Sequence, residues 1–464
     1  MQERCITMAR EVGMHKKQLM LERDVKSLIP GMALPPIVAQ LITKVYNLVD
    51  TYFVSTLGTA ATAAVGVNGS LEHTITMLAG LIGSGACSYI ARLLGEKRNQ
   101  DADRVLSTSF FSGMVVGILI AIFGTVFVTP LMRLLSSNAE SEAYAVQYGT
   151  YVLMAAPFMI GSFILNMCLR SEGRSTYAMV GIAAGGILNC FLDPLFIYTF
   201  DLGVTGASMA TAISKIISFC ILLWPYVKKQ CAVVISLRRI KVVMKDVQEV
   251  LSIGSTTCLR SVCNVVASIL INRIAGSFST AALAAVSVAN RVMEFPFAVI
   301  LGFSQGCQPI VGFNWGAKRL DRVKETMRIS IRVAVIGSVL FAVVLFVFAR
   351  PLVDLFNSDR NMEVLRLGIL CARLQCVTLL IHSMESVVCM FYAGTGKAKY
   401  SLLMATARQG YCFYPAVLTL PFLLGAEGVA ACQAAADLLM LAVAIPLSVK
   451  AFKIIKQAEE CGHV

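Results

Sequence analysis

Long apolar segments alternate with short polar segments along most of this chain. Five of the apolar segments contain no Asp, Glu, Lys or Arg: 74–91, 105–132, 145–169, 333–349 and 409–426. Apolar segments with an occasional charge fill the intervals: 28–54, 62–73, 177–200, 207–227, 250–275, 283–313, 365–391 and 428–449. Runs of about 17 to 25 residues are long enough to cross a bilayer as helices. Since 62–73 continues into 74–91, the pattern predicts twelve transmembrane helices.

Composition narrows the class of protein further. Hydrophobic residues make up 57% of the 464 residues and charged residues 14%, with a mean hydropathy of +0.74. Soluble domains average about 25% charged residues, so a soluble or disordered protein is excluded. The sequence therefore predicts an all-α polytopic membrane protein. Its fifteen cysteines contain no CxxC pair and its four histidines no metal-like cluster, so we expect no metal framework and no cofactor.

The placement of Lys and Arg predicts the orientation. With the N-terminus in the cytoplasm, nearly all loop Lys and Arg fall on the cytoplasmic side, while the outer loops hold only Arg133, Arg350 and Arg360. Cytoplasmic loops of membrane proteins carry this excess. We therefore expect a multi-pass protein of the bacterial cytoplasmic membrane with both termini inside. The same loops explain the net charge of +13 without a nucleic-acid partner.

An internal repeat divides the chain into two halves. The nine residues from Thr59 to Val67 reappear, with small changes, from Thr280 to Val288, and Gly95 and Lys97 recur at the same spacing as Gly316 and Lys318. Six helices in each half give both halves the same orientation, so the repeat predicts two parallel six-helix bundles around a central cleft. The expected divisions are a cytoplasmic segment 1–27, a lobe 28–231, a linker 232–249, a lobe 250–449 and a tail 450–464.

Carboxyl and amide groups within the apolar segments are candidate functional groups, because a charge inside the membrane costs about 2.5–3.5 kcal/mol on insertion scales. In the first segment, Tyr46 and Asp50 share one helix face with Asn47 beside it. In the fifth, Asn189 and Asp193 are one turn apart and Pro194 frees a backbone carbonyl. These oxygens suit an alkali cation or a proton relay. The alternatives are an interfacial Asp50 and a simple kink at Pro194.

Other charged residues allow two interpretations. Glu72 is a candidate for the cleft, and Arg291 and Glu294 either line the cleft or neutralise each other, since they lie three residues apart. The second half contains further ionisable residues, for which pairs between helices are the default expectation: Arg260, Arg273, Arg373, Glu385, Arg408 and Asp437. The sequence contains no P-loop, so we expect no direct ATP hydrolysis and no enzyme activity.

Four motifs resemble those of a known family. The segment from Tyr46 to Gly58 (YNLVDTYFVSTLG) resembles the first-helix signature of MATE (multidrug and toxic compound extrusion) transporters. The segment 91–95 (ARLLG) resembles their loop after the second helix, and Gly302 to Ala317 resembles their eighth-helix signature. The motif 188–194 (LNCFLDP) is similar to the DinF-like branch, which includes MepA-type exporters. The resemblance covers nearly the whole chain.

The resemblance implies a V-shaped fold and a secondary antiporter that exports cationic or amphipathic drug-like compounds in exchange for H⁺ or Na⁺. In the DinF-like branch the coupling cation is held in the first lobe by residues that match Asp50, Asn189, Asp193 and Thr211 here, with supporting roles for Tyr46 and Asn47. If Na⁺ is the coupling ion, the first four are its expected ligands. The other expected partner is membrane lipid, and we expect a monomer. The NorM-like branch has an acidic residue on helix seven, whereas the segment 254–260 here contains Arg260 and no carboxylate, so a NorM-type sodium site in the second lobe is not expected.

A second function stays open at this stage. Lipid-linked oligosaccharide flippases of the same superfamily line their cleft with several cations, and Arg260, Arg273 and Arg373 are compatible with that function. Asp50 and Asp193 favour a cationic cargo instead.

Overall fold

The computed structural model describes residues 20–135, 139–357 and 361–461, and all regular structure within these ranges is helical. The first half contains α2 (Val25–Ser55), α3 (Thr59–Gly95), α4 (Asn99–Val126), α5 (Val128–Leu135), α6 (Ala139–Ser171), α7 (Ser175–Pro194), the π-helical turn η1 (Leu195–Thr199) and α8 (Gly203–Val227). The second half contains η2 (Leu237–Arg239), α9 (Met244–Phe278), α10 (Thr280–Gly316), α11 (Leu320–Val347), α12 (Ala349–Leu355), α13 (Met362–Gly394), α14 (Ala398–Ala407) and α15 (Phe413–Cys461).

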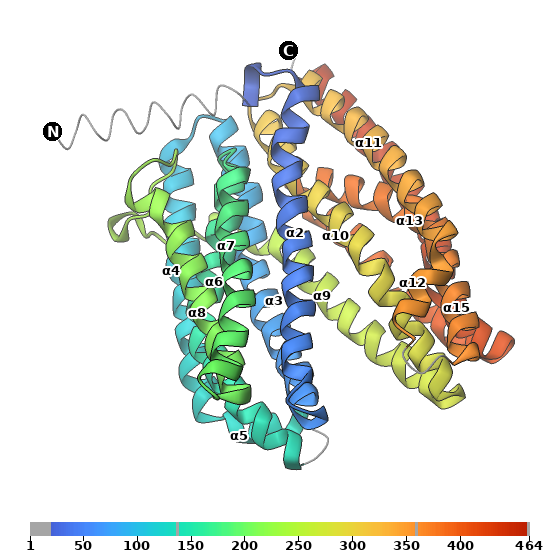
Figure 1. Cartoon of the computed structure of the whole chain (residues 1–464). Coiled ribbons are helices and arrows are strands. Elements are labelled where there is room, and N and C mark those ends of the chain that lie inside the picture. The colour runs from blue at the N-terminus through green and yellow to red at the C-terminus, as the bar shows by residue number, and fades with distance from the viewer. Residues whose placement is uncertain (1–19, 136–138, 358–360, 462–464) are drawn as a thin grey trace.

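These helices form two bundles. Figure 1 shows α2–α8, in blue to green, as one lobe and α9–α15, in yellow to red, as the other. The lobes approach each other at the end where the N and C labels lie, and they diverge toward the end that carries α5. The first end, which carries the connections 96–98, 228–243 and 317–319, is called the basic end below. The two lobes that the repeat predicts and the V shape that the resemblance implies are both confirmed.

The repeat is visible in individual helices. The α3 and α10 helices are both 37 residues long, and α4 and α11 are both 28 residues long. The turns that follow α3 and α10 each place a lysine at positive φ, Lys97 at 63° and Lys318 at 57°. The same local sequence therefore produces the same turn in both lobes.

The eleventh predicted segment is interrupted. Among the described residues, eleven helices are long and apolar enough to cross a membrane, because the predicted eleventh and twelfth segments, 409–426 and 428–449, both fall largely within α15. Residues 408–412 form turns between α14 and α15. Pro415 lies in the first turn of α15, where a helix tolerates its missing N–H. Gly425, with φ 61° and ψ −138°, divides α15 and begins the twelfth segment.

The third predicted segment also ends earlier than expected. The sequence predicted one helix over 105–132, whereas α4 ends at Val126 and α5 follows as a separate short helix. Charge alone did not mark this boundary, since 105–132 contains none. The connection between α8 and α9 covers 228–243, so the last part of the predicted linker 232–249 already belongs to α9. The expected segment 1–27 lies outside the described residues up to position 19.

Glycines bring the two lobes into backbone contact at the basic end. A Cβ atom on Gly254 of α9 would lie 1.7 Å from the carbonyl oxygen of Leu81, and one on Gly85 of α3 would lie 1.9 Å from that of Val250. The α3 and α10 helices meet in the same way through Gly95 and Gly316. Real Cβ atoms do not approach so closely, so only glycine allows these crossings.

Ion pairs flank the glycine contacts. Arg92 Nη2 of α3 lies 2.9 Å from Glu249 Oε2 of α9, and Arg104 Nε of α4 donates to Asp246 Oδ2 at 2.8 Å. The Tyr89 hydroxyl donates to the other oxygen of Asp246. These residues join the first lobe to the first turns of α9, so both charge pairing and backbone packing hold the basic end closed.

Buried carboxylates attach the linker between the lobes to the first lobe. Glu172 is 3% exposed and accepts hydrogen bonds from the Tyr226 hydroxyl at 2.9 Å and from the backbone N–H of Ala232 at 2.6 Å. Asp103 accepts from the N–H of Val234 at 2.7 Å and pairs with Arg239. The linker is therefore a packed segment of the first lobe.

We predict that alanine at Gly254 weakens the contact between the lobes. The new Cβ would force α3 and α9 apart, so the melting temperature of the purified protein in detergent should fall by at least about 2 °C. Gly337 of α11 is the matched control, since a Cβ there would meet nothing within 4 Å and Gly337→Ala should be neutral or stabilising. Equal melting temperatures for the two variants would contradict the close packing.

We also predict that linker attachment weakens as pH rises. Burial raises the pKa of Glu172 from its ordinary value of 4.5 to about 7, against smaller opposing effects of the hydrogen bonds from Tyr226 and Ala232 and of the Arg174 charge. The stabilisation that this protonated group contributes is fully present below pH 4.5 and is lost as pH rises through about 7. Hydrogen-exchange protection of the Ala232 and Val233 amides, corrected for intrinsic rates, should therefore fall between about pH 6 and 8.

The control for this measurement is Glu172→Gln, which has no proton to lose. Protection in this variant should not change with pH. If the variant keeps the pH dependence of the native protein, another group controls the linker.

Candidate functional site

The structure brings Asp50 and Asp193 together inside the first lobe. Asp50 lies near the end of α2, and Asp193 is fully buried at the end of α7, which packs along α2. The two carboxyl groups lie within hydrogen-bonding reach of each other. Pro194 follows directly, and the chain continues as the π-helical turn η1 instead of a regular helix. This departure agrees with the backbone carbonyl that a proline frees one turn back.

Polar side chains from three helices surround Asp193. The Asn189 amide donates to Asp193 Oδ1 at 3.0 Å and to the hydroxyl of Thr211 on α8 at 3.4 Å. The Tyr148 hydroxyl of α6 lies 3.5 Å from the same Thr211 oxygen. Asn189, Thr211 and Tyr148 are all buried. The four residues predicted to hold a coupling ion therefore meet in one place, and Tyr148 joins them.

Each carboxyl of the Asp50–Asp193 pair has an oxygen that lacks a partner. Asp50 Oδ1 and Asp193 Oδ2 are buried and accept no hydrogen bond from any residue in the described ranges. An unpartnered buried acceptor is costly. A proton held between the two groups, or a bound cation, would satisfy both oxygens.

The amide of Asn189 turns its nitrogen toward both Asp193 and Thr211. Its oxygen would reach a sodium ion at that place only if the amide turned over.

A lysine that the sequence interpretation passed over lies beside this site. Lys215 Nζ donates to the hydroxyl of Tyr46 at 3.0 Å and lies 5.3 Å from the centre of its ring. Asp50 and Glu72 are close enough to act on Lys215 electrostatically. The signal was available, because Lys215 lies one turn after Thr211 on the same face of α8.

A cavity of about 440 Å³ adjoins the carboxyl pair. Asn189 and Thr211 line it, and so do the predicted cleft residues Tyr46 and Asn47. Because Asn189 also contacts Asp193, it links the cavity to the carboxyl pair. Glu72 does not line the cavity, although its charge acts electrostatically on Asp50.

Arg170 reaches this cavity from the basic end. It lies at the end of α6, is 3% exposed and donates to Gln305 Oε1 of α10 at 2.7 Å. Gln40 of α2 donates to the same oxygen at 3.2 Å. Gln305 thus connects the second lobe to two helices of the first.

Two predicted cleft residues do not pair as expected. Glu294 contacts Lys44 Nζ of α2 at 3.2 Å, and Arg291, three residues before it on α10, is exposed and does not contribute to this pair. The suggestion that Arg291 and Glu294 neutralise each other is therefore wrong, because a partner on another helix lies closer. The expected pairing between helices of the second lobe does occur for Arg408 and Asp437, at 2.9 Å.

Comparisons with known proteins agree with this arrangement. A family model described as MatE matches residues 35–195 and 257–418. The Multidrug export protein MepA of Staphylococcus haemolyticus is 28% identical over 399 residues, covering 86% of this chain and 87% of that protein. The protein of the same name from Staphylococcus saprophyticus is 25% identical over 408 residues, covering 87% and 89%.

Solved structures share the fold. A multidrug resistance MATE family transporter in an outward-facing conformation superimposes with a TM-score of 0.88 at 24% identity, covering 95% of this chain and 98% of that one. A MATE structure in the bent conformation gives a TM-score of 0.89 at 24% identity, covering 97% and 99%. A MOP superfamily transporter from Pyrococcus furiosus also matches, with a TM-score of 0.88 at 24% identity and 95% and 98% coverage. At this identity the likeness concerns the fold.

We predict that Asn189→Ala destabilises the fold. Asp193 Oδ1 and the Thr211 hydroxyl would both lose their amide donor, which should lower the unfolding free energy by about 1–3 kcal/mol. Reversible denaturation of the purified protein measures this loss. Asn47→Ala, which removes an exposed amide from α2 near the same cavity, should change the free energy much less, and a larger effect at Asn47 would contradict the hydrogen-bond network.

Proposed function

Since this chain belongs to the MATE family of membrane transporters, we propose that it exports cationic and amphipathic drug-like compounds in exchange for protons. Export would proceed by alternating access of the space between the two lobes. The names of its relatives, all multidrug export proteins among those compared above, favour this function over a lipid-linked oligosaccharide flippase.

One observation carries the proposal: the contact between Asp50 and Asp193, each with a buried oxygen that lacks a partner among the described residues. Two ionised carboxylates in contact repel each other strongly where the local dielectric is low. One proton shared by the pair removes this repulsion. The pair therefore binds and releases a proton as a unit.

Exchange follows from the same repulsion. The positive charge of a drug-like cation in the adjoining cavity would stabilise the ionised pair. A proton on the pair would weaken the electrostatic attraction that holds the cation. Either positive species is sufficient, so binding of one disfavours the other. Lys215 contributes a fixed positive charge beside Tyr46, which limits how strongly the ionised pair attracts a second cation.

The positive-inside rule assigns the basic end to the cytoplasm. The glycine contacts close that end, and the lobes diverge at the other. With this orientation the structure is an outward-open state, in which the carboxyl pair exchanges protons with the outside. Closure of the outer end and separation of α3 from α9 and α10 would then expose the first-lobe cavity to the cytoplasm.

The test is efflux of ethidium from proteoliposomes under separately imposed pH and sodium gradients. A pH gradient should drive efflux without sodium, and Asp50→Asn and Asp193→Asn should each reduce it to the level of empty liposomes. Asp201→Asn is the matched control. Asp201 is exposed in the turn before α8 with φ 52°, a conformation that asparagine also adopts.

Efflux in the Asp201→Asn variant should equal that of the native protein. Full activity of both Asp50→Asn and Asp193→Asn would refute the carboxyl pair as the coupling site. Efflux driven by sodium alone would retain the site but refute proton coupling.

A further inference from the structure

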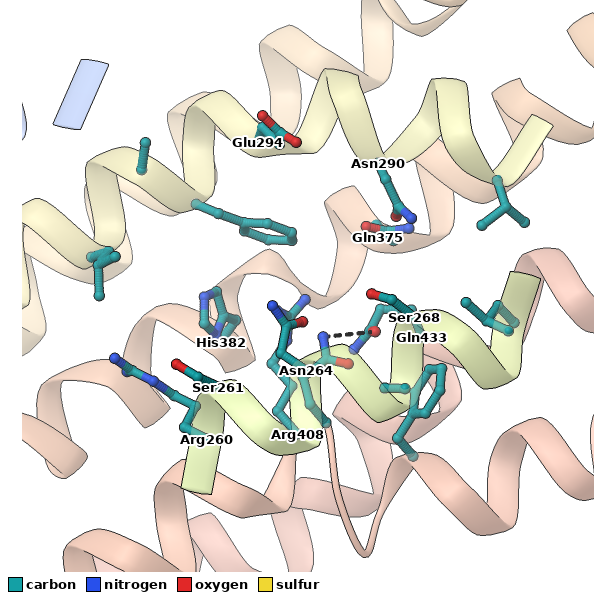
Figure 2. A pocket seen from close by; sticks show the side chains of 18 of the residues that line it. Arg260, Ser261, Asn264, Ser268, Asn290, Glu294, Gln375, His382, Arg408 and Gln433 are labelled. Carbon is teal, nitrogen blue, oxygen red and sulfur yellow. Dashed lines mark hydrogen bonds between the residues drawn. The ribbon is translucent and has the colours of Figure 1, made fainter. Parts of the chain in front are cut away.

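A second cavity, of about 570 Å³, lies mainly between α9, α10, α13 and α15 of the second lobe, and Gln40, Lys44 and His73 line it from the first lobe. Figure 2 shows amide side chains from all four helices around it: Asn264, Asn290, Gln375 and Gln433. Ser261 and Ser268 of α9 line the same space. The cavity is large enough for a drug-sized molecule. Its lining is amide-rich, unlike that of the coupling site, where carboxylates dominate.

One wall of the cavity is fixed by Asp437. Arg408 Nε donates to its Oδ1 at 2.9 Å, Gln433 Nε2 donates to the same oxygen at 3.1 Å, and the Thr378 hydroxyl donates to Oδ2 at 2.8 Å. Gln409 in turn donates to Gln433 Oε1 at 3.3 Å, the bond drawn in Figure 2. The amides on this side are therefore held in place before any molecule binds.

One guanidinium beside the cavity has no ion-pair partner within 4 Å among the described residues. Glu294 is paired with Lys44 and Asp437 with Arg408. Glu385, which also lines the cavity, has its Oε2 3.3 Å from Nδ1 of His382, a contact that is an ion pair only when His382 is protonated. Arg260, at the edge of the cavity in Figure 2, forms no ion pair with any residue in the described ranges. An unpaired guanidinium beside a cavity attracts a carboxylate.

A buried amide oxygen also lacks a partner. Gln375 is 2% exposed, and its Oε1 accepts no hydrogen bond within the part of the chain that the structure describes. Its amide nitrogen donates only to the sulfur of Cys371, at 3.3 Å. Figure 2 shows Gln375 beside Asn290, across the cavity from Ser268 and Gln433. Buried polar groups are normally paired, so Gln375 presents an acceptor for an N–H or O–H group in the cavity.

We propose that this cavity is a second binding site, for small monocarboxylates that also carry amide or hydroxyl groups. Arg260 holds the carboxylate, and Gln375 with the neighbouring amides binds the polar groups of the rest of the molecule. Binding here does not depend on the proposed proton exchange, although export of a compound bound here would rest on it. Arg260 also lines the first-lobe cavity, so it stands where the two cavities adjoin.

The test is equilibrium binding of radiolabelled N-acetyltyrosine to the purified protein in nanodiscs, compared with its uncharged amide, N-acetyltyrosinamide. The native protein should bind the carboxylate more tightly than the amide. Arg260→Gln should weaken carboxylate binding by about tenfold, the effect of losing a charged hydrogen bond, and leave amide binding unchanged. Gln375→Leu should weaken binding of both probes.

Two controls separate this site from the rest of the molecule. Arg373→Gln removes a guanidinium of the same lobe that packs on Phe346 and does not line the cavity, so it should bind both probes normally. Asp50→Asn should also bind them normally, whether or not it still exports ethidium. Failure of the proposed function can therefore be told apart from failure of this binding site. No saturable binding to the native protein, or equal binding by Arg260→Gln and Arg373→Gln, would overturn the proposal.

Discussion

The close backbone contact between the lobes is the constraint on which the rest of the structure depends. Gly85 and Gly254 let α3 and α9 cross at a distance that no side chain would permit, and Gly95 and Gly316 do the same for α3 and α10. Because the lobes meet so tightly at one end, helices of 28 to 37 residues diverge at the other. Two adjoining cavities then remain, and Arg260 and Ser261 of α9 line both of them.

The first-lobe site shows how a membrane protein positions charges that the bilayer disfavours. Asp193 is buried at the end of α7, and each polar atom near it comes from a different helix: Asn189 from α7, Thr211 from α8 and Tyr148 from α6. Nearly every donor there is in use, yet one oxygen of each carboxyl is not. Such an incomplete network is stabilised when a positive charge binds there, and either a proton or a cation supplies that charge.

The sequence predicted what periodicity and repetition determine, and missed what depends on contacts between helices. The repeat from Thr59 to Val67 predicted two equal lobes, and the one-turn spacing of Asn189 and Asp193 located the centre of the site. The pairing of Glu294 with Lys44 could not be predicted, because those residues lie 250 positions apart. Arg170 directly follows the charge-free segment 145–169, and nothing in the sequence indicates that its side chain reaches inward to Gln305. Uninterrupted hydrophobicity over 409–426 also concealed the turns at 408–412 that separate α14 from α15.

The glycine crossings of α3 with α9 and α10 are made by main-chain atoms and glycine hydrogens, and this has a consequence for how such a molecule changes over generations. Substitutions on the cavity walls leave these crossings untouched, since no residue that lines the two cavities takes part in them. The frame and the recognition surface are thus separately mutable. Successive substitutions on the cavity walls can therefore change which compounds bind without changing how the two lobes move relative to each other.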